Sequence, residues 1–177
     1  MADPTKPQIT EIKTGHHEGY MRLALSLAIK SPPKPTNYRV GAVVVNTATN
    51  EVLATGYTLE LPGNTHAEQC CLEKLAEKYS VTVTDLGEAL PDTVVLYTTM
   101  EPCSQRLSGN APCVDRILAV GKRINTVYVG VQEPETFISA NSSRRKLEDA
   151  GIGVVHVGGL EREILEVATA GHEKPPP

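Results

Sequence analysis

The sequence has no long apolar run, and no stretch of its 177 residues approaches the ~20 apolar residues that a membrane-spanning helix requires. Its first ten residues, MADPTKPQIT, also lack the apolar core of a secretory signal peptide. Its 14 glycines and 13 prolines are scattered along the chain, which excludes collagen-like and low-complexity sequences. We therefore expect an intracellular protein, in the cytoplasm by default, that does not contact a membrane.

Positive charge is also scarce. The chain carries 17 lysines and arginines against 21 aspartates and glutamates, for a net charge of −4 and an isoelectric point near 5.7. This balance argues against a polyanion as the partner, so we expect no nucleic acid, although a local basic patch stays possible. A length of 177 residues, of which 40% are apolar, is sufficient for one globular domain with its own core.

The hydrophobic pattern alternates between helical and extended periodicity. Apolar residues at helical spacing predict helices over 17–30, 66–79, 112–120, 143–150 and 160–169. Short β-branched runs predict strands over 40–45, 52–59, 93–99, 126–131 and 153–157, and the first two form a hairpin. This order predicts an α/β fold, a three-layer α-β-α sandwich around a five-stranded mixed sheet. Its fourth and fifth strands run parallel because a helix connects them.

The two ends of the chain differ from this central region. Residues 1–15 are polar and contain two prolines, so we expect a flexible N-terminal arm. Residues 171–177 end in three consecutive prolines and predict an extended, exposed tail. Residues 16–170 therefore form the single predicted domain, and the residues that carry chemistry lie within it.

Four cysteines in an intracellular chain are core residues, redox groups or metal ligands, because disulfides are rare there. Cys103 follows Pro102 just after the third predicted strand, and Cys113 follows Pro112 at the start of the next helix. His66 lies in the first turn of another helix, and helix N-termini favour thiolates. Two thiolates and a neutral imidazole suit Zn²⁺, one ion per chain, and leave the fourth tetrahedral position open for water.

Glu68 lies two residues after His66, close to the predicted metal without having to bind it. A carboxylate there can take a proton from water and return it to a leaving group. Alternatively, Glu68 lies three residues after Thr65 and could complete a capping box, and the two roles can coexist. His-x-Glu followed by Pro-Cys and a second cysteine is the signature of zinc deaminases, so the combination predicts a catalytic zinc site.

The cysteines have a simpler alternative, because free cysteine packs in cores as a small hydrophobe. Cys103 and Cys113, taken alone, could both be such residues. Cys70 and Cys71 are adjacent on a predicted helix and point about 100° apart, so they cannot easily bind the same metal. We expect these two to be buried core thiols.

The motifs around these residues resemble the cytidine deaminase-like superfamily over about residues 17–170. Most members have two residues between the cysteines, whereas nine separate Cys103 from Cys113. A long insert ending in Pro-Cys is similar to the riboflavin-pathway pyrimidine deaminases. The segments TLELPGNTHAEQ (58–69) and EPCSQRLSGN (101–110) resemble the fungal Rib2-type form of that family. This resemblance implies hydrolysis of 2,5-diamino-6-ribitylamino-4(3H)-pyrimidinone 5′-phosphate to 5-amino-6-ribitylamino-2,4(1H,3H)-pyrimidinedione 5′-phosphate and ammonia.

The same resemblance implies residues that contact this small phosphorylated pyrimidine. They are Asn37 before the first strand, Asn64 beside the metal motif, Gln105 and Arg106 in the insert, and Glu133 after the fourth strand. Arg106 is the first candidate for the phosphate, because a guanidinium matches phosphate geometry, and Arg39 is a second candidate. Simpler alternatives exist: turn chemistry for the asparagines and Glu133, and a solvated loop charge for Arg106.

The residues alone leave other functions open. A guanine, nucleotide or tRNA adenosine deaminase would share the zinc motif, although tRNA requires a more basic surface than a net charge of −4 suggests. A non-catalytic zinc-binding interaction module is a second alternative, which the open fourth position and Glu68 disfavour. The resemblance also implies a homodimer. It leaves open whether the chain is a whole protein or one domain of a longer chain.

Overall fold

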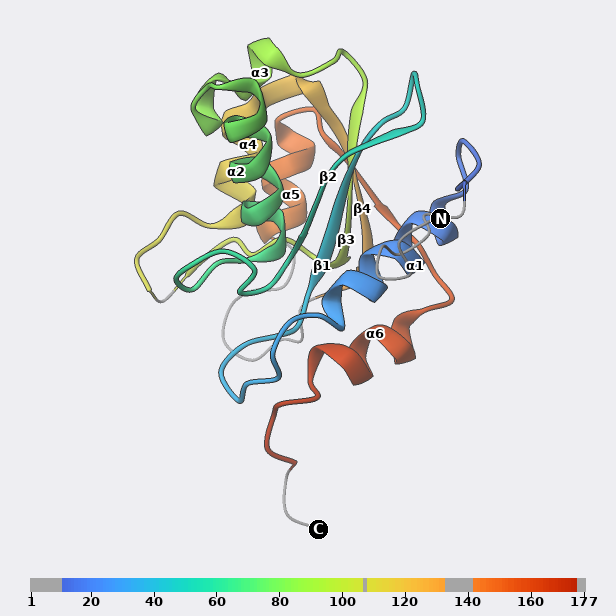
Figure 1. The fold of residues 1–177 in the computed structure, drawn as a ribbon, viewed down its shortest axis with the longest axis vertical. Helices are drawn as coiled ribbons and strands as arrows, with labels where there is room; N and C mark the ends of the chain where they lie inside the picture. Colours follow the sequence, from blue (N-terminus) through green and yellow to red (C-terminus); the bar gives the residue numbers. More distant parts are fainter. Residues whose placement is uncertain (1–10, 107, 133–141, 175–177) are drawn as a thin grey trace, which may run out of the picture.

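The computed structural model describes residues 11–106, 108–132 and 142–174. Its centre is a five-stranded sheet in the order β2-β1-β3-β4-β5, with helices on both faces (Figure 1). The main elements are α1 (His17–Ala28), β1 (Gly41–Asn46), β2 (Glu51–Tyr57), α2 (Ala67–Tyr79), β3 (Val94–Met100), α4 (Cys113–Val120), β4 (Ile124–Val131), α5 (Ser142–Asp149), β5 (Gly153–His156) and α6 (Glu161–Ala168). Within the described ranges, every helix is too short or too polar to cross a bilayer.

The strand directions confirm the predicted mixed sheet. Strand β1 pairs antiparallel with both β2 and β3, whereas β3, β4 and β5 all run parallel. Each parallel pair is joined through a helix, α4 between β3 and β4 and α5 between β4 and β5. Because parallel neighbours need such crossovers, the ends of β3 and β4 lie on the same edge of the sheet as the starts of the helices that follow them.

The helices form two separate layers. Figure 1 shows α1 and α6 on one face of the sheet and α2, α4 and α5 on the other. Every residue of β1 and β3 is buried, as expected for strands covered on both faces, and their β-branched and apolar composition suits this position. The loops at one edge of this rigid central layer carry the residues with predicted chemistry.

The ten predicted helices and strands are confirmed, with boundaries that shift by one to two residues at most ends. The pattern missed the short α3 (Leu86–Ala89) and two 3₁₀ turns, η1 (Val83–Asp85) and η2 (Gly121–Arg123). Most of the predicted N-terminal arm, residues 1–10, lies outside the described residues. At the other end, the first two residues of the predicted exposed tail differ from expectation, because Gly171 and His172 are half-buried.

The packing of α1 on β1 requires a residue without a side chain at position 41. A Cβ on Gly41 would collide with the carbonyl oxygen of Ala24 and lie 2.7 Å from the amide nitrogen of Ala28. Both are backbone atoms of α1, so the helix would have to move away from the sheet. We expect Gly41→Ala to lower the free energy of unfolding by about 1–3 kcal/mol, measured by urea denaturation. Gly153→Ala is the control, because its Cβ meets nothing closer than 3.6 Å. Equal stability of the two variants would contradict this interpretation.

Candidate metal centre

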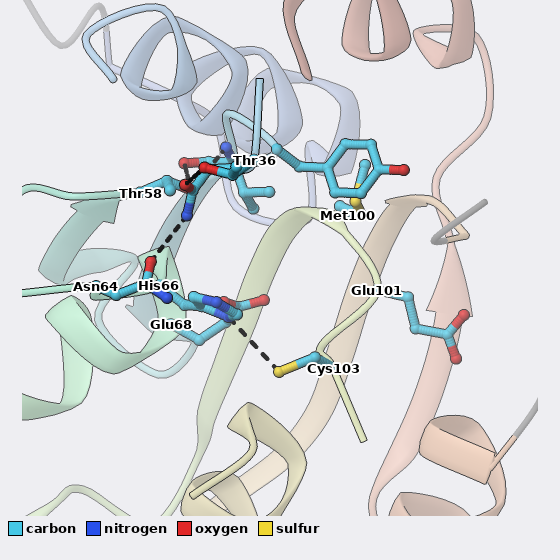
Figure 2. Close-up of a pocket in the computed structure, with 11 residues that line it drawn as sticks. Thr36, Thr58, Asn64, His66, Glu68, Met100, Glu101 and Cys103 are labelled. Atoms are coloured by element: carbon cyan, nitrogen blue, oxygen red, sulfur yellow. Dashed lines mark hydrogen bonds between the residues drawn. The ribbon is translucent and has the colours of Figure 1, made fainter. Parts of the chain in front are cut away.

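Two helices begin beside the end of β3, and each contributes a ligand candidate at its first turn. His66 is the residue that precedes α2 and has an extended backbone, and Cys113 is the first residue of α4. Pro112 precedes α4 with φ of −60°, the value that a proline ring imposes. Cys103 lies in the loop that leaves β3, and Figure 2 shows its sulfur directed at the His66 ring. The structure therefore brings all three predicted ligands together.

The spacing of the three donor atoms fits a tetrahedral metal. Nδ1 of His66 lies 3.5 Å from Sγ of Cys103 and 3.4 Å from Sγ of Cys113, and all three atoms lie within 4.8 Å of one another. With Zn–S bonds of about 2.3 Å and Zn–N bonds of about 2.0 Å, tetrahedral geometry places neighbouring sulfur and nitrogen ligands about 3.5 Å apart. One imidazole and two thiols are also a donor set that Zn²⁺ prefers. The residues present fit a zinc ion.

Hydrogen bonds within the cluster make Cys103 the more acidic thiol. Hydrogen bonding to Cys113 and His66, against the opposing effect of burial, lowers the pKa of Cys103 to about 4. The backbone N–H of Cys113 contributes by donating to the Cys103 sulfur at 3.3 Å. Cys113 behaves in the opposite way, since its hydrogen bond with Cys103 and its complete burial hold its pKa well above the usual range. A second thiolate at this position needs a compensating cation, which a divalent metal supplies.

Glu68 lies in the first turn of α2 beside this cluster, and it is buried, with an exposed fraction of 3%. Burial raises the pKa of its carboxyl group, while the nearby His66 and a hydrogen bond from Thr98 oppose that shift. The Thr98 hydroxyl on β3 donates to Oε1 of Glu68 at 2.9 Å. The capping-box alternative is wrong: α2 is preceded by His66 and has no side-chain cap, and the Thr65 hydroxyl donates to the Leu61 carbonyl instead.

A cavity of about 210 Å³ opens onto the metal cluster. Its walls are Thr36, Asn37, Tyr38, Val40, Thr58, Asn64, His66, Glu68, Met100, Glu101 and Cys103. Asn37 and Asn64, two of the residues predicted to contact the substrate, thus line this cavity, and Nδ2 of Asn37 donates to Oδ1 of Asn64 at 2.8 Å. Sequence reasoning missed the other walls, Thr36, Tyr38, Thr58, Met100 and Glu101 among them. The only signal for them was their position at strand ends beside recognised motifs.

Two of the remaining predicted contacts, Gln105 and Arg106, are not among the described walls of this cavity. Gln105 is exposed, and Glu133 lies outside the described residues. Arg106 donates from Nη1 to Oε1 of Gln69 at 3.0 Å and from Nη2 to the carbonyl oxygen of Asn64. Its guanidinium therefore fastens the insert to the segment that precedes the metal motif. Its contact with a phosphate stays a prediction.

Cys70 and Cys71 are buried core thiols, as predicted. Neither belongs to the metal cluster. Their sulfurs face backbone carbonyls, those of Tyr57 at 3.6 Å and Ala42 at 3.5 Å, and burial raises the pKa of both thiols. A raised thiol pKa keeps the group protonated and unreactive. These two cysteines pack α2 against β1 and β2.

A second cavity, of about 430 Å³, adjoins the first at Glu101. Its described walls are Glu101, Val129, Val131, Gln132, Arg144, Val154, His156 and Glu161. Figure 2 shows the Glu101 carboxylate pointing away from the metal cluster. Burial raises the pKa of this carboxyl group, and the charge and backbone N–H of Arg144 oppose the shift. Glu101 thus lies between the two cavities, and its carboxylate interacts with Arg144, a wall of the second cavity.

Comparison with known proteins identifies the sequence region that contains the cluster. Residues 14–131 match the family model described as the cytidine and deoxycytidylate deaminase zinc-binding region. A diaminohydroxyphosphoribosylamino-pyrimidine deaminase of Schizosaccharomyces pombe is 38% identical over 169 residues. That alignment covers 96% of this chain and 39% of the relative, so the chain spans about two fifths of the length of this curated protein.

Solved structures show the same fold. The Rib2 deaminase of Aspergillus oryzae, a C-terminal deletion mutant, is similar with a TM-score of 0.80 and 50% identity, covering 89% of this chain and 92% of that one. The same protein has been solved in complex with DARIPP. A deaminase/reductase of Thermotoga maritima matches with a TM-score of 0.68 and 28% identity over 88% of this chain and 40% of its own.

The assignment of Cys113 as a metal ligand and of Cys70 as a core thiol can be tested by measuring bound zinc. We expect Cys113→Ser to reduce bound zinc from one ion per chain to less than about a tenth, because it removes one of three protein ligands. Cys70→Ser should leave one zinc per chain, since that buried thiol lies outside the cluster. Elemental analysis after dialysis measures both. Full zinc occupancy in Cys113→Ser, or equal loss in the two variants, would contradict the assignment.

Proposed function

We propose a function for this chain from its family. The chain belongs to the cytidine and deoxycytidylate deaminase family, because its residues 14–131 match the zinc-binding region of that family. The protein is a hydrolytic deaminase of riboflavin biosynthesis. It converts 2,5-diamino-6-ribitylamino-4(3H)-pyrimidinone 5′-phosphate to 5-amino-6-ribitylamino-2,4(1H,3H)-pyrimidinedione 5′-phosphate and ammonia. The observation that carries the proposal is the buried carboxylate of Glu68, which shares one cavity with the His–Cys–Cys cluster.

The choice of substrate follows from the relatives. The S. pombe protein acts, by its name, on a diaminohydroxyphosphoribosylamino-pyrimidine, and the A. oryzae protein binds DARIPP. This protein is 50% identical to the A. oryzae chain over 92% of that chain, and it shares its fold. The cavity, at about 210 Å³, has room for a single ring.

The reaction exchanges one bond on the pyrimidine ring. A water oxygen forms a new bond to carbon 2, the bond between carbon 2 and its amino nitrogen breaks, and the nitrogen leaves as ammonia. Zinc held by His66, Cys103 and Cys113 would supply a Lewis acid that lowers the pKa of water enough to make it nucleophilic near neutral pH. The protein must provide the proton transfers and the orientation of the ring.

Glu68 is the residue placed for the proton transfers. Its carboxylate accepts the proton that water loses on attack and delivers it to the adjacent ring nitrogen. It then accepts the remaining hydroxyl proton at carbon 2, where the oxygen becomes a carbonyl, and delivers this second proton to the amino group that leaves as ammonia. A carboxylate is suited to this when it is shielded from bulk water and held in one orientation, and both conditions are met here by burial and by the Thr98 hydrogen bond. Because Glu68 is not among the ligand atoms of the cluster, it is available to carry protons.

The cavity walls offer contacts that orient the ring. Asn37 and Asn64 present amide groups that can hydrogen-bond the edge of a pyrimidine, and their mutual hydrogen bond fixes the orientation of both amides. Arg106 is proposed to bind the phosphate: a guanidinium has five N–H groups, and described residues accept from two of its nitrogens. Gln105 and Glu133 complete the proposed contacts, as the family resemblance implies.

Two further parts of the proposal come from the sequence and the resemblance rather than from contacts. We propose that the protein works inside the cell, where its four cysteines stay reduced. We also propose, from the family resemblance, that it forms a homodimer. Its net charge of −4 supports the proposal that it has no nucleic-acid partner.

The decisive experiment removes the proton carrier and keeps the metal. We expect Glu68→Gln to lower kcat for ammonia release from the phosphorylated pyrimidine by at least about a hundredfold, with zinc still at one ion per chain. Glu77→Gln, an exposed residue of the same helix, should retain full activity. Guanine and dCMP are tested in parallel as rival substrates. Near-normal turnover by Glu68→Gln would remove the proposed role, and zinc-loaded wild-type protein that deaminates none of these compounds would favour the interaction module.

The phosphate assignment has its own test. We expect Arg106→Ala to raise KM for the phosphorylated substrate by at least about tenfold, because charge-assisted hydrogen bonds to the phosphate are lost. The same variant should lose much less with the dephosphorylated compound. This comparison isolates the phosphate contact from the hydrogen bonds that Arg106 makes to Gln69 and Asn64. Arg145→Ala, an exposed arginine of α5, is the control. An equal loss with both compounds would show that Arg106 acts only by holding the loop.

A further inference from the structure

The chain beyond α6 packs against the loop that follows α1, and both lie near the same end of the molecule (Figure 1). The backbone N–H of His172 donates to the Thr169 carbonyl at 2.9 Å, which turns the chain back after the helix. Gly171 then approaches the loop so closely that a Cβ would lie 2.6 Å from the carbonyl carbon of Pro33 and 2.8 Å from that of Lys34. Only glycine permits this contact between two backbones.

The His172 side chain extends this contact to the next residues of the loop. Its Nε2 lies 3.0 Å from the carbonyl oxygen of Asn37, and because a carbonyl can only accept, Nε2 carries the hydrogen. The His172 ring also packs against the Tyr38 ring, with centroids 4.8 Å apart at an interplanar angle of 59°. The His172 side chain therefore contacts both the backbone of Asn37 and the ring of Tyr38.

Asn37 and Tyr38 are walls of the cavity that contains the metal cluster, whereas His172 is not. The Asn37 amide is held from the other side as well, since the Thr36 hydroxyl donates to its Oδ1 at 2.9 Å and its Nδ2 donates to Asn64 at 2.8 Å. His172 thus supports, from outside the cavity, the backbone from which these side chains project. The two residues joined by the His172–Asn37 hydrogen bond are 135 positions apart in the sequence.

We propose that His172 is a positioning residue for substrate binding, which acts by fixing Asn37 and Tyr38 in the cavity wall. The proposal rests on the function proposed above. The metal ligands and Glu68 lie at the start of α2, at the start of α4 and in the loop after β3, none of which His172 contacts through its ring. Loss of the His172 contacts should therefore weaken substrate binding while the chemical step and the metal stay intact.

Two substitutions separate the contacts of this side chain. His172→Phe keeps a ring beside Tyr38 and removes the donor to Asn37, and we expect it to raise KM about three- to tenfold, the effect of losing one net hydrogen bond. Its kcat should stay within about twofold of the wild-type value, with one zinc per chain and an unchanged melting temperature. His172→Gln keeps an N–H donor and should restore most of the affinity. Glu173→Ala, at the exposed next position, is the matched control and should change nothing.

A pair of truncations tests the same contact without a substitution. A chain that ends at Lys174 keeps His172 and should bind substrate as the full chain does. A chain that ends at Ala170 loses Gly171 and His172 together and should show the raised KM of His172→Phe. A parallel measurement in the Glu68→Gln background, by calorimetric titration with the phosphorylated pyrimidine, gives the dissociation constant directly and should change by the same factor.

The outcomes distinguish failure of this inference from failure of the proposed function. If wild-type protein deaminates the pyrimidine and His172→Phe has an unchanged KM, or loses kcat, zinc or thermal stability without recovery in His172→Gln, the inference is overturned and the function stands. If wild-type protein neither binds nor deaminates the pyrimidine, the proposed function fails. Hydrogen exchange over residues 33–40 then decides the positioning role: faster exchange in His172→Phe than in Glu173→Ala supports it, and equal exchange overturns it.

Discussion

Two helices that begin at one point, beside the end of β3, determine how the active centre is built. His66 precedes α2 and Cys113 starts α4, so the free N–H groups of both first turns face the same small volume. One of these groups, the Cys113 N–H, donates to the Cys103 sulfur at 3.3 Å and stabilises it as a thiolate. The parallel pairing of β3 with β4 requires α4 as a crossover, and this crossover places the second cysteine opposite the first. The long insert between the cysteines is possible because only its two ends are constrained by the metal.

Burial of a carboxylate next to this centre is costly unless its charge has partners. Glu68 is placed in the first turn of α2, where the helix dipole favours a negative charge, and Thr98 on the adjacent strand supplies a hydrogen bond. The pleat of β3 directs Thr98 toward α2 while the neighbouring Tyr97 points to the α1 face, where it stacks with Tyr20 and Tyr128. A one-residue shift in the register of β3 that brought Tyr97 to this position would replace the threonine by an aromatic ring and leave the carboxylate without its donor. The sheet register thus controls the chemistry of the site.

Most of the fold and the metal centre could be predicted from the sequence because both depend on local patterns. Apolar periodicity located the ten main elements, and proline before cysteine marked two ligands at a strand end and a helix start. The cavity walls could not be predicted in this way, since Thr58, Met100 and Tyr38 meet only after three separate loops fold together. His172 shows the limit most clearly. Its neighbours in the sequence are typical of an exposed tail, and its contact with Asn37 depends on the close approach of Gly171 to a distant backbone.

The distribution of charge around the two cavities separates ring binding from phosphate binding. The described walls of the metal cavity include no lysine or arginine, so they offer a phosphate no ion pair with a basic side chain. Arg144, a wall of the second cavity, is already compensated, because it pairs with Glu148 at 2.9 Å and lies against Glu101. Arg106 hydrogen-bonds only to neutral partners among the described residues, the Gln69 amide and the Asn64 carbonyl, so its charge remains available to an anion beside the segment that precedes the metal motif. The proposed substrate, which carries a pyrimidine at one end and a phosphate at the other, joined by a flexible polyol, matches this arrangement, whereas a free purine would offer the arginine no anionic partner.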